Sequence, residues 1–243
     1  MHIPILAGWL TLILLSSTLA ACGILGSPEP TPSPTPTPRE LGASIGRTTQ
    51  TSQSVSFSIE LSGKPVYSDS SGLFVINSIS GDLQRSTGML AILTVSSIAG
   101  VAEIRVVSLT TQFYVTNPIT RQWQCLAPDA LFDPAVLFDP AQGIESLLQS
   151  DFEEVSLVGM EDFDGRRNYH LRGSIAGLRL QAISDGKLGA GPVTLDLWAD
   201  AETLRATKLQ LVDTATDPVD PSTWTLTFSD YDQDVAIRAP IEC

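Results

Sequence analysis

Residues 54–61 read Ser54-Val55-Ser56-Phe57-Ser58-Ile59-Glu60-Leu61, an unbroken alternation of polar residues at even positions and apolar residues at odd positions. Successive side chains of a β-strand point to opposite faces of a sheet, so this period predicts a strand with one buried and one solvated face. Residues 193–197 and 224–229 alternate in the same way. Such strands are common in antiparallel sheets, and the chain is therefore expected to be mainly β.

Further strands are expected at residues 87–95, 101–109, 152–160 and 167–173. The last two flank Asp162-Phe163-Asp164-Gly165, and Asp-Gly is a favoured pair at the tip of a two-residue hairpin turn. Short connections join antiparallel neighbours, whereas parallel strands need long crossovers. The pattern therefore predicts an antiparallel meander.

Helical signals are few. Two short helices are expected at residues 133–138 and 139–148, because each begins with Asp followed by Pro, a pair suited to an N-cap and the first helical position. A third is expected at 174–184, where Leu178 and other apolar residues recur at helical spacing. The polar stretch 40–53 is a further candidate. The predicted class is α+β with β structure dominant.

The first 21 residues have the features of a bacterial lipoprotein signal peptide. Residues 3–21 are apolar and contain no Asp, Glu, Lys or Arg. They end in Leu19-Ala20-Ala21-Cys22, which resembles a lipobox and implies diacylglyceryl transfer to the Cys22 thiol, cleavage before it and acylation of the new amino terminus. A transmembrane anchor is the alternative, but it needs about 20 apolar residues and flanking charges.

Residues 22–39 are expected to form the lipidated cysteine and a tether rich in Pro and Thr. Proline occupies every second position from Pro28 to Pro38, which excludes a helix and a central strand. An extended polyproline spacer rises about 3.1 Å per residue, so this stretch would hold the domain roughly 30 Å from the bilayer. The globular domain would comprise residues 40–243.

Two of the three cysteines remain once Cys22 carries lipid. Cys125 and Cys243 would then lie in an oxidising compartment, where disulfides form and persist. We expect them to be bridged, which would tie the last residue of the chain to its middle. Two free thiols are the alternative.

The 243 residues include 14 Lys and Arg against 27 Asp and Glu, so the formal net charge is −13. This balance argues against nucleic acid as a partner, because no basic face could neutralise phosphates. It also argues against electrostatic docking on an anionic membrane. Acyl chains on Cys22 would anchor the protein without such help.

No residue pattern assembles an active site, a cofactor site or a metal site. His170 is the one histidine outside the predicted signal peptide, and it lies on a predicted strand. Gly42-Ala43-Ser44-Ile45-Gly46 matches a nucleophile elbow but follows the tether rather than a strand. Residues 230–234 begin like a calcium loop, yet Val235 replaces the required glycine. We therefore expect no enzyme, with a hydrolase as the remote alternative.

Five short motifs lie at residues 113–123, 138–144, 197–200, 228–232 and 237–240. Taken in this order, they resemble the LppX/LprG-type lipid-binding lipoproteins of the bacterial envelope. The likeness extends over about residues 40–240. It implies a curved antiparallel half-barrel with helices across its concave face, similar to LolA-type carriers. Acyl chains would lie in the apolar space between sheet and helices.

The resemblance implies a monomeric lipoprotein, lipid-anchored outside the cytoplasm, which carries or presents an envelope lipid or glycolipid. An envelope transporter or another lipoprotein would be its protein partner. A tethered sensor or interaction domain of the same fold is the alternative, and the apolar residues would then pack as an ordinary core. The residues expected to line the cavity are Phe57, Ile59, Ile104, Val106, Leu147, Leu148, Leu178, Leu195, Leu197, Leu226 and Phe228.

Overall fold

The computed structural model describes four stretches of the chain: residues 35–68, 72–127, 132–189 and 191–243. One compact unit, residues 36–243, contains every described strand and helix and both disulfide-bonded cysteines. It has a hydrophobic core of its own, and a unit of this kind can in principle fold without the residues that precede it. Cys22, the predicted signal peptide and the predicted tether up to residue 34 lie outside the described residues. Within the described stretches, no helix combines the length and hydropathy that crossing a bilayer requires.

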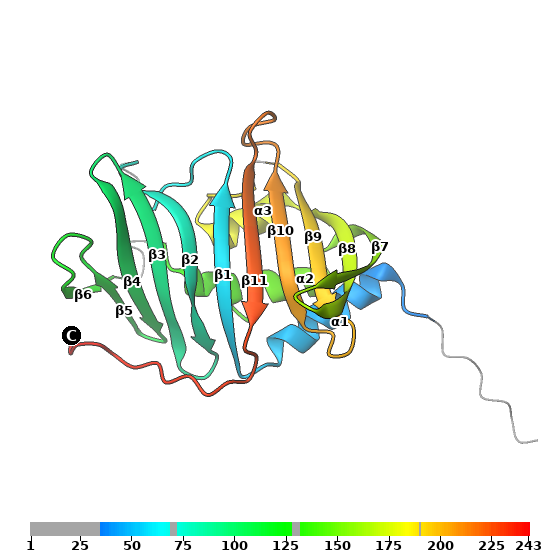
Figure 1. Cartoon of the computed structure of the whole chain (residues 1–243), viewed down its shortest axis with the longest axis horizontal. Helices are drawn as coiled ribbons and strands as arrows, with labels where there is room; N and C mark the ends of the chain where they lie inside the picture. Colours follow the sequence, from blue (N-terminus) through cyan, green and yellow to red (C-terminus); the bar gives the residue numbers. More distant parts are fainter. Residues whose placement is uncertain (1–34, 69–71, 128–131, 190) are drawn as a thin grey trace, which may run out of the picture. The chain divides into compact units, whose positions relative to one another are not determined.

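The strands form one antiparallel sheet in the order β6-β5-β4-β3-β2-β1-β11-β10-β9-β8-β7 (Figure 1). Strands β1 to β6 and β7 to β11 each form a meander, and the pairing of β1 with β11 joins the two halves. The strands are β1 (Ser54–Ser62), β2 (Val75–Gln84), β3 (Gly88–Ser97), β4 (Gly100–Leu109), β5 (Gln112–Thr116), β6 (Trp123–Leu126), β7 (Glu153–Phe163), β8 (Arg166–Ile175), β9 (Val193–Asp200), β10 (Ala206–Asp213) and β11 (Ser222–Ser229).

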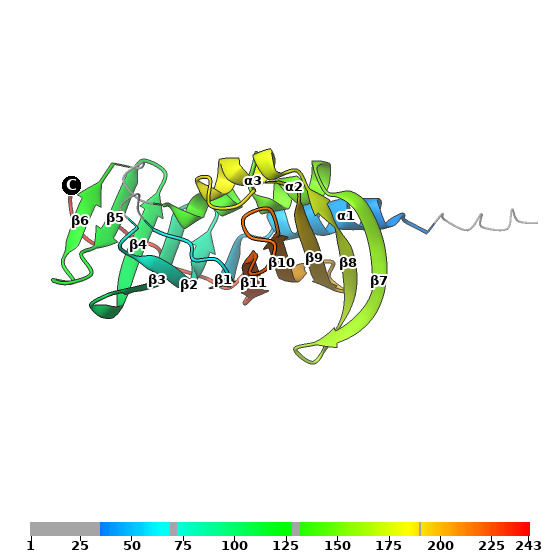
Figure 2. The same cartoon turned by 90° about the horizontal axis from the view of Figure 1, so that it is seen from above.

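The sheet is open and curved, and the helices lie on one face of it (Figure 2). This arrangement confirms the expected architecture. The helices are α1 (Pro38–Gln50), the 3-10 helix η1 (Pro134–Phe138), α2 (Ile144–Ser150) and α3 (Gly177–Ser184). We refer to η1 and α3 together as the cover.

The N-terminal helix α1 begins with a capping box. The Glu40 N–H donates to Thr37 Oγ1, and the Glu40 carboxylate accepts from the Thr37 N–H at 2.7 Å. Pro38 occupies the first helical position, where its missing N–H removes no hydrogen bond. The helix therefore begins two residues before the predicted domain boundary at residue 40, and Pro38 belongs to the domain rather than to an extended tether.

The central strands have the alternation that the sequence predicts. Phe57 of β1 pairs with Phe228 of β11, and both side chains are buried on the face that carries the helices. On the opposite face, Ser58 and Thr227 form a hydrogen bond of 2.6 Å between their hydroxyls. One side of the sheet is therefore apolar and covered, and the other is polar.

The C-terminal segment, residues 230–243, runs from β11 back to β6 (Figure 1). Cys243 forms the expected disulfide with Cys125 of β6. Along this path Ile237 packs against Val107 of β4 and Tyr114 of β5 in a second, smaller hydrophobic cluster. The segment therefore covers an apolar part of the outer face, and the disulfide fastens its end.

Two predicted helices begin later than expected. The Asp139 carboxylate accepts from the N–H groups of Ala141 and Gln142 as an N-cap would, but only a turn follows, because the backbone is extended at Gly143. Helix α2 then begins at Ile144 with Gly143 as its N-cap. Helix α3 begins at Gly177 rather than at residue 174, because β8 pairs with β9 as far as Ile175.

Candidate functional site

The candidate site is the apolar layer between the inner face of the sheet and the helices. Ten of the eleven predicted lining residues are buried there and belong to one hydrophobic cluster. The strands contribute eight of them and α2 contributes two. The ten are Phe57, Ile59, Ile104, Val106, Leu147, Leu148, Leu195, Leu197, Leu226 and Phe228.

The eleventh residue, Leu178, was predicted wrongly. Its side chain is 78% exposed, whereas Leu180 and Ile183 of the same helix are 1% exposed. The prediction counted Ile175 as helical, which placed Leu178 on the same apolar face one turn later. Because Ile175 is the last residue of β8 instead, the inner face of α3 passes through Leu180 and Ile183.

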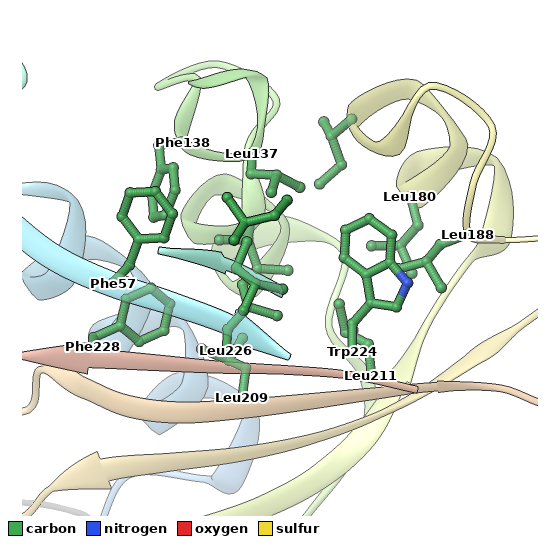
Figure 3. Packing of buried hydrophobic residues seen from close by; sticks show 14 of the residues in the cluster. Phe57, Leu137, Phe138, Leu180, Leu188, Leu209, Leu211, Trp224, Leu226 and Phe228 are labelled. Carbon is green, nitrogen blue, oxygen red and sulfur yellow. The ribbon is translucent and has the colours of Figure 1, made fainter. Parts of the chain in front are cut away.

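Aromatic rings connect the cover to the sheet (Figure 3). The ring of Phe138, at the end of η1, lies 4.9 Å from that of Phe57 and 6.3 Å from that of Phe228, centroid to centroid. Farther along the layer, Phe132 packs edge-on against Trp224 of β11 at 6.4 Å. Phe132, Phe138 and Trp224 were not among the predicted lining residues. Trp224 could have been found, because it shares the alternating face of Leu226 and Phe228.

Near Phe132 the side chains leave little free space inside the layer. A pocket of about 10 Å³ lies among Ser68, Leu93, Ile104, Val106 and Phe132. A cavity of this size holds at most about one water molecule, and ligand pockets typically measure about 300–1,000 Å³. In the described residues around this pocket, the layer is closed and filled by its own side chains.

One polar atom inside the layer has no partner. The Trp224 side chain is fully buried, and its Nε1–H finds no acceptor among the described residues. Leu211 of β10 lies below the indole in Figure 3, with Leu180 and Leu188 on the side of α3. Leucine side chains cannot accept a hydrogen bond.

A largely buried ion pair links the end of β2 to the helices. Arg85, which follows β2, pairs with Glu145 of α2 and donates to the backbone oxygens of Ser52 and Thr49. Burial raises the pKa of the Glu145 carboxyl, and the Arg85 guanidinium opposes that rise. These contacts join β2, α1 and α2, so their role is structural.

His170 lies on the outer face, away from the layer. Its Nδ1 is 2.7 Å from Glu161 Oε1, and its Nε2 is 2.6 Å from Asp196 Oδ1. The ring stacks on Trp198 at 4.2 Å, and the Trp198 N–H donates to Glu161. Hydrogen bonds from Trp198 and His170 lower the pKa of the Glu161 carboxyl. Both ring nitrogens are engaged, and the cluster holds β7, β8 and β9 together.

Two other sequence motifs do not form the sites that their patterns resemble. Residues 42–46 lie inside α1, not at the strand-to-helix turn that a nucleophile elbow requires. Asp232, from the stretch that begins like a calcium loop, accepts from the Gln53 N–H at 2.7 Å and pairs with Arg205. Among the residues with described positions, no group of three or more His, Cys, Asp or Glu side chains could hold a metal ion.

Comparison with known proteins gives a consistent result. The profile of the LppX_LprAFG lipoprotein family matches residues 37–237. Among solved structures, LprF from Mycobacterium bovis has a TM-score of 0.66 at 16% identity, over 86% of this chain and 100% of LprF. Lipoprotein LppX from Mycobacterium tuberculosis has a TM-score of 0.57 at 15% identity, over 82% of this chain and 97% of LppX. At these identities the two likenesses show a shared fold. No curated protein matches the sequence.

Proposed function

Because the chain belongs to the LppX_LprAFG lipoprotein family, we propose that it binds the acyl chains of an envelope lipid between its sheet and its helices. The protein is anchored outside the cytoplasm through acylated Cys22 and a tether of Pro and Thr residues. It carries or presents a lipid or glycolipid within the cell envelope. The proposal includes no catalytic step.

One observation carries the proposal: the layer is apolar on both of its sides, from the sheet and from the helices. An acyl chain has no group that hydrogen-bonds, so it needs a lining of this kind. The ten buried residues of the predicted lining are all apolar and form one cluster. Such a lining fits an acyl chain better than a polar metabolite, whose groups would be desolvated without partners.

Lipid entry requires the cover to move away from the sheet. At η1, the cover is fastened by a hydrogen bond of 2.6 Å from Ser108 Oγ to Asp133 Oδ2. Beyond α3, the Gly189 N–H donates to Asp213 Oδ2 at 2.7 Å. Apolar packing across the layer is non-directional, so contacts with a lipid chain can replace contacts between side chains at small net cost.

The test is to purify residues 36–243 from an oxidising bacterial compartment, extract the protein with organic solvent and identify the extract by mass spectrometry. The expected result is about one acylated lipid per chain. As a control, the same protein unfolded and washed in denaturant before extraction releases none. Absence of stoichiometric lipid, together with failure to take up lipid from vesicles, would remove the carrier function.

The closed layer also favours a second candidate, a tethered sensor or interaction domain. In that case the pocket of about 10 Å³ reflects an ordinary core that never opens. A pull-down of the full-length lipoprotein from detergent-solubilised envelope separates the two functions. A stable protein partner with no bound lipid supports the interaction domain, and bound lipid supports the carrier.

A further inference from the structure

We propose that the indole N–H of Trp224 donates a hydrogen bond to a carbonyl oxygen of the bound lipid. The site would then select acyl esters and amides over hydrocarbon chains that lack a carbonyl. This inference rests on the proposed function, because it names the polar contact of the same lipid site. Its starting point is the fully buried Nε1–H, which has no acceptor among the described residues.

Trp224 lies where a ligand between the two layers would contact it. It is near the start of β11, between Leu61 of β1 and Leu211 of β10 in the sheet register. Its side chain points to the covered face, and Figure 3 shows the indole between the sheet and the residues Leu180 and Leu188 on the α3 side. The N–H therefore points into an apolar layer rather than toward solvent.

The chemistry of the indole determines what it can bind. An indole N–H is a donor and never an acceptor, so its partner must bring a lone pair. Buried tryptophans usually have such a partner, and a buried donor without one is destabilising. An ester or amide carbonyl is an acceptor that every acyl chain carries at its polar end. A phenylalanine at this position would fill the space without creating the unmet donor.

A cation lies at the same end of the layer. The Lys187 ammonium is 5.3 Å from the centroid of the Phe132 ring, and that ring packs edge-on against Trp224. The Lys187 side chain is 13% exposed and pairs with the exposed carboxylate of Asp185 at 2.9 Å. The polar end of a lipid would thus lie near α3, with its carbonyl at Trp224 and its tail running toward Phe57.

Two probes that differ in one carbonyl test the proposal. Methyl palmitate and hexadecyl methyl ether have matched chains, and only the ester has a C=O. We expect delipidated residues 36–243 to bind the ester about 3- to 10-fold more tightly than the ether, the range of one hydrogen bond. We also expect the ester to shift the Trp224 indole N–H proton farther downfield than the ether does, in a proton–nitrogen-15 correlation NMR spectrum.

Variants identify the donor. Trp224→Phe is expected to remove the preference for the ester over the ether, because the phenyl ring has no N–H to donate to the carbonyl. Trp198→Phe is the matched control, because Trp198 lies on the outer face and its N–H already donates to Glu161. It should preserve the preference for the ester.

The outcomes separate this inference from the proposed function. If the wild-type protein binds both probes equally and the Trp224 indole proton does not shift, the carbonyl contact is wrong and lipid binding stands. If neither probe binds, both are wrong. The comparison of two probes on wild-type protein does not depend on whether Trp224→Phe folds.

Discussion

Phe57 of β1 and Phe138 of η1 lie with their ring centroids 4.9 Å apart and their planes at 51°, and this contact joins the sheet to its cover. The ring of Phe228 packs against Phe138 from the neighbouring strand β11. Rings from the sheet and from the cover therefore meet in the middle of the layer. If acyl chains bind between the sheet and the helices as proposed, these ring contacts must separate to admit them.

The two faces of α3 provide a matched pair of substitutions. Leu180→Ala should lower the free energy of unfolding by about 2–5 kcal/mol, because it opens a cavity in a buried layer. Leu178→Ala, two residues earlier on the exposed face, should change it by less than about 0.5 kcal/mol. Urea unfolding followed by circular dichroism measures both values. Equal losses would mean that α3 is oriented differently.

Removing the charge of only one partner of the Arg85–Glu145 ion pair should lower the stability of the fold. Glu145→Gln leaves the Arg85 guanidinium without its charged partner, in a site where the Glu145 side chain is 2% exposed. A loss of about 3–5 kcal/mol of stability is expected. Replacing both residues together, as Arg85→Met with Glu145→Leu, should recover much of that loss. Thermal and urea unfolding of the single and double variants form the measurement.

An exposed ion pair is the control for this experiment. Arg167 Nη1 and Asp162 Oδ1 are 3.9 Å apart, and the two side chains are 63% and 76% exposed. Asp162→Asn should cost at most about 1 kcal/mol. A similar cost for Glu145→Gln would contradict the structural role of the buried pair.

The alternation of residues 54–61 was sufficient to predict β1 and its buried face, because a strand with one covered face has few other ways to arrange its side chains. Strand β2 was not predicted. Its pairing with β3 shifts register between Ile76 and Ser78. At Gly81, the Cβ of any other residue would lie 2.1 Å from the backbone oxygen of Leu90. A bulge and a glycine forced by close contact both interrupt the period of two.

The site could be predicted only in part, for a similar reason. Periodicity identifies the covered side of each strand, so the buried positions of Leu195 and Leu226 followed from the sequence. The phase of a short helix depends on where the preceding strand ends, which misplaced Leu178. The space between the layers depends on how rings such as Phe138 and Phe57 meet, and no pattern in the sequence specifies that distance.

The disulfide should stabilise the protein and hold the C-terminal segment. Cys125→Ser opens a loop with a sequence separation of 118 residues, and we expect a loss of about 2–5 kcal/mol. The segment carrying Ile237 should also become more sensitive to protease, because its end is released. Reductant should produce the same two effects in the wild-type protein and none in the variant. A stable variant with a protected tail would contradict this role.

Acid should destabilise the fold through two carboxylates. Burial opposes ionisation of Asp200, but the N–H groups of Thr203 and Glu202 outweigh it and lower the pKa. A hydrogen bond from the Gln53 N–H and the pair with Arg205 lower the pKa of Asp232. Since both folded pKa values lie below the unfolded value of about 3.9, their stabilisation is present above about pH 4 and is lost as pH falls through the folded values.

The Asp200→Asn variant tests the contribution of one of these two carboxylates. Asp200→Asn should lower stability by about 1–3 kcal/mol at pH 7, because it weakens the hydrogen bonds that the carboxylate accepts. As the pH falls through the folded pKa of Asp200, the difference from the wild-type protein should shrink, since the carboxyl then becomes protonated in both states. Urea unfolding across pH 2–7 provides the comparison, and a pH-independent difference would contradict it.

The central claim is that acyl chains lie between the sheet and the helices. The most direct measurement records nuclear Overhauser effects between the chain methylenes of bound methyl palmitate and the leucine methyl groups of residues 36–243. We predict contacts with Leu180, Leu195 and Leu226, which are buried in the layer, and none with Leu178 on the outer face of α3. Contacts with Leu178 alone, or no contacts with the buried leucines at saturating lipid, would contradict it.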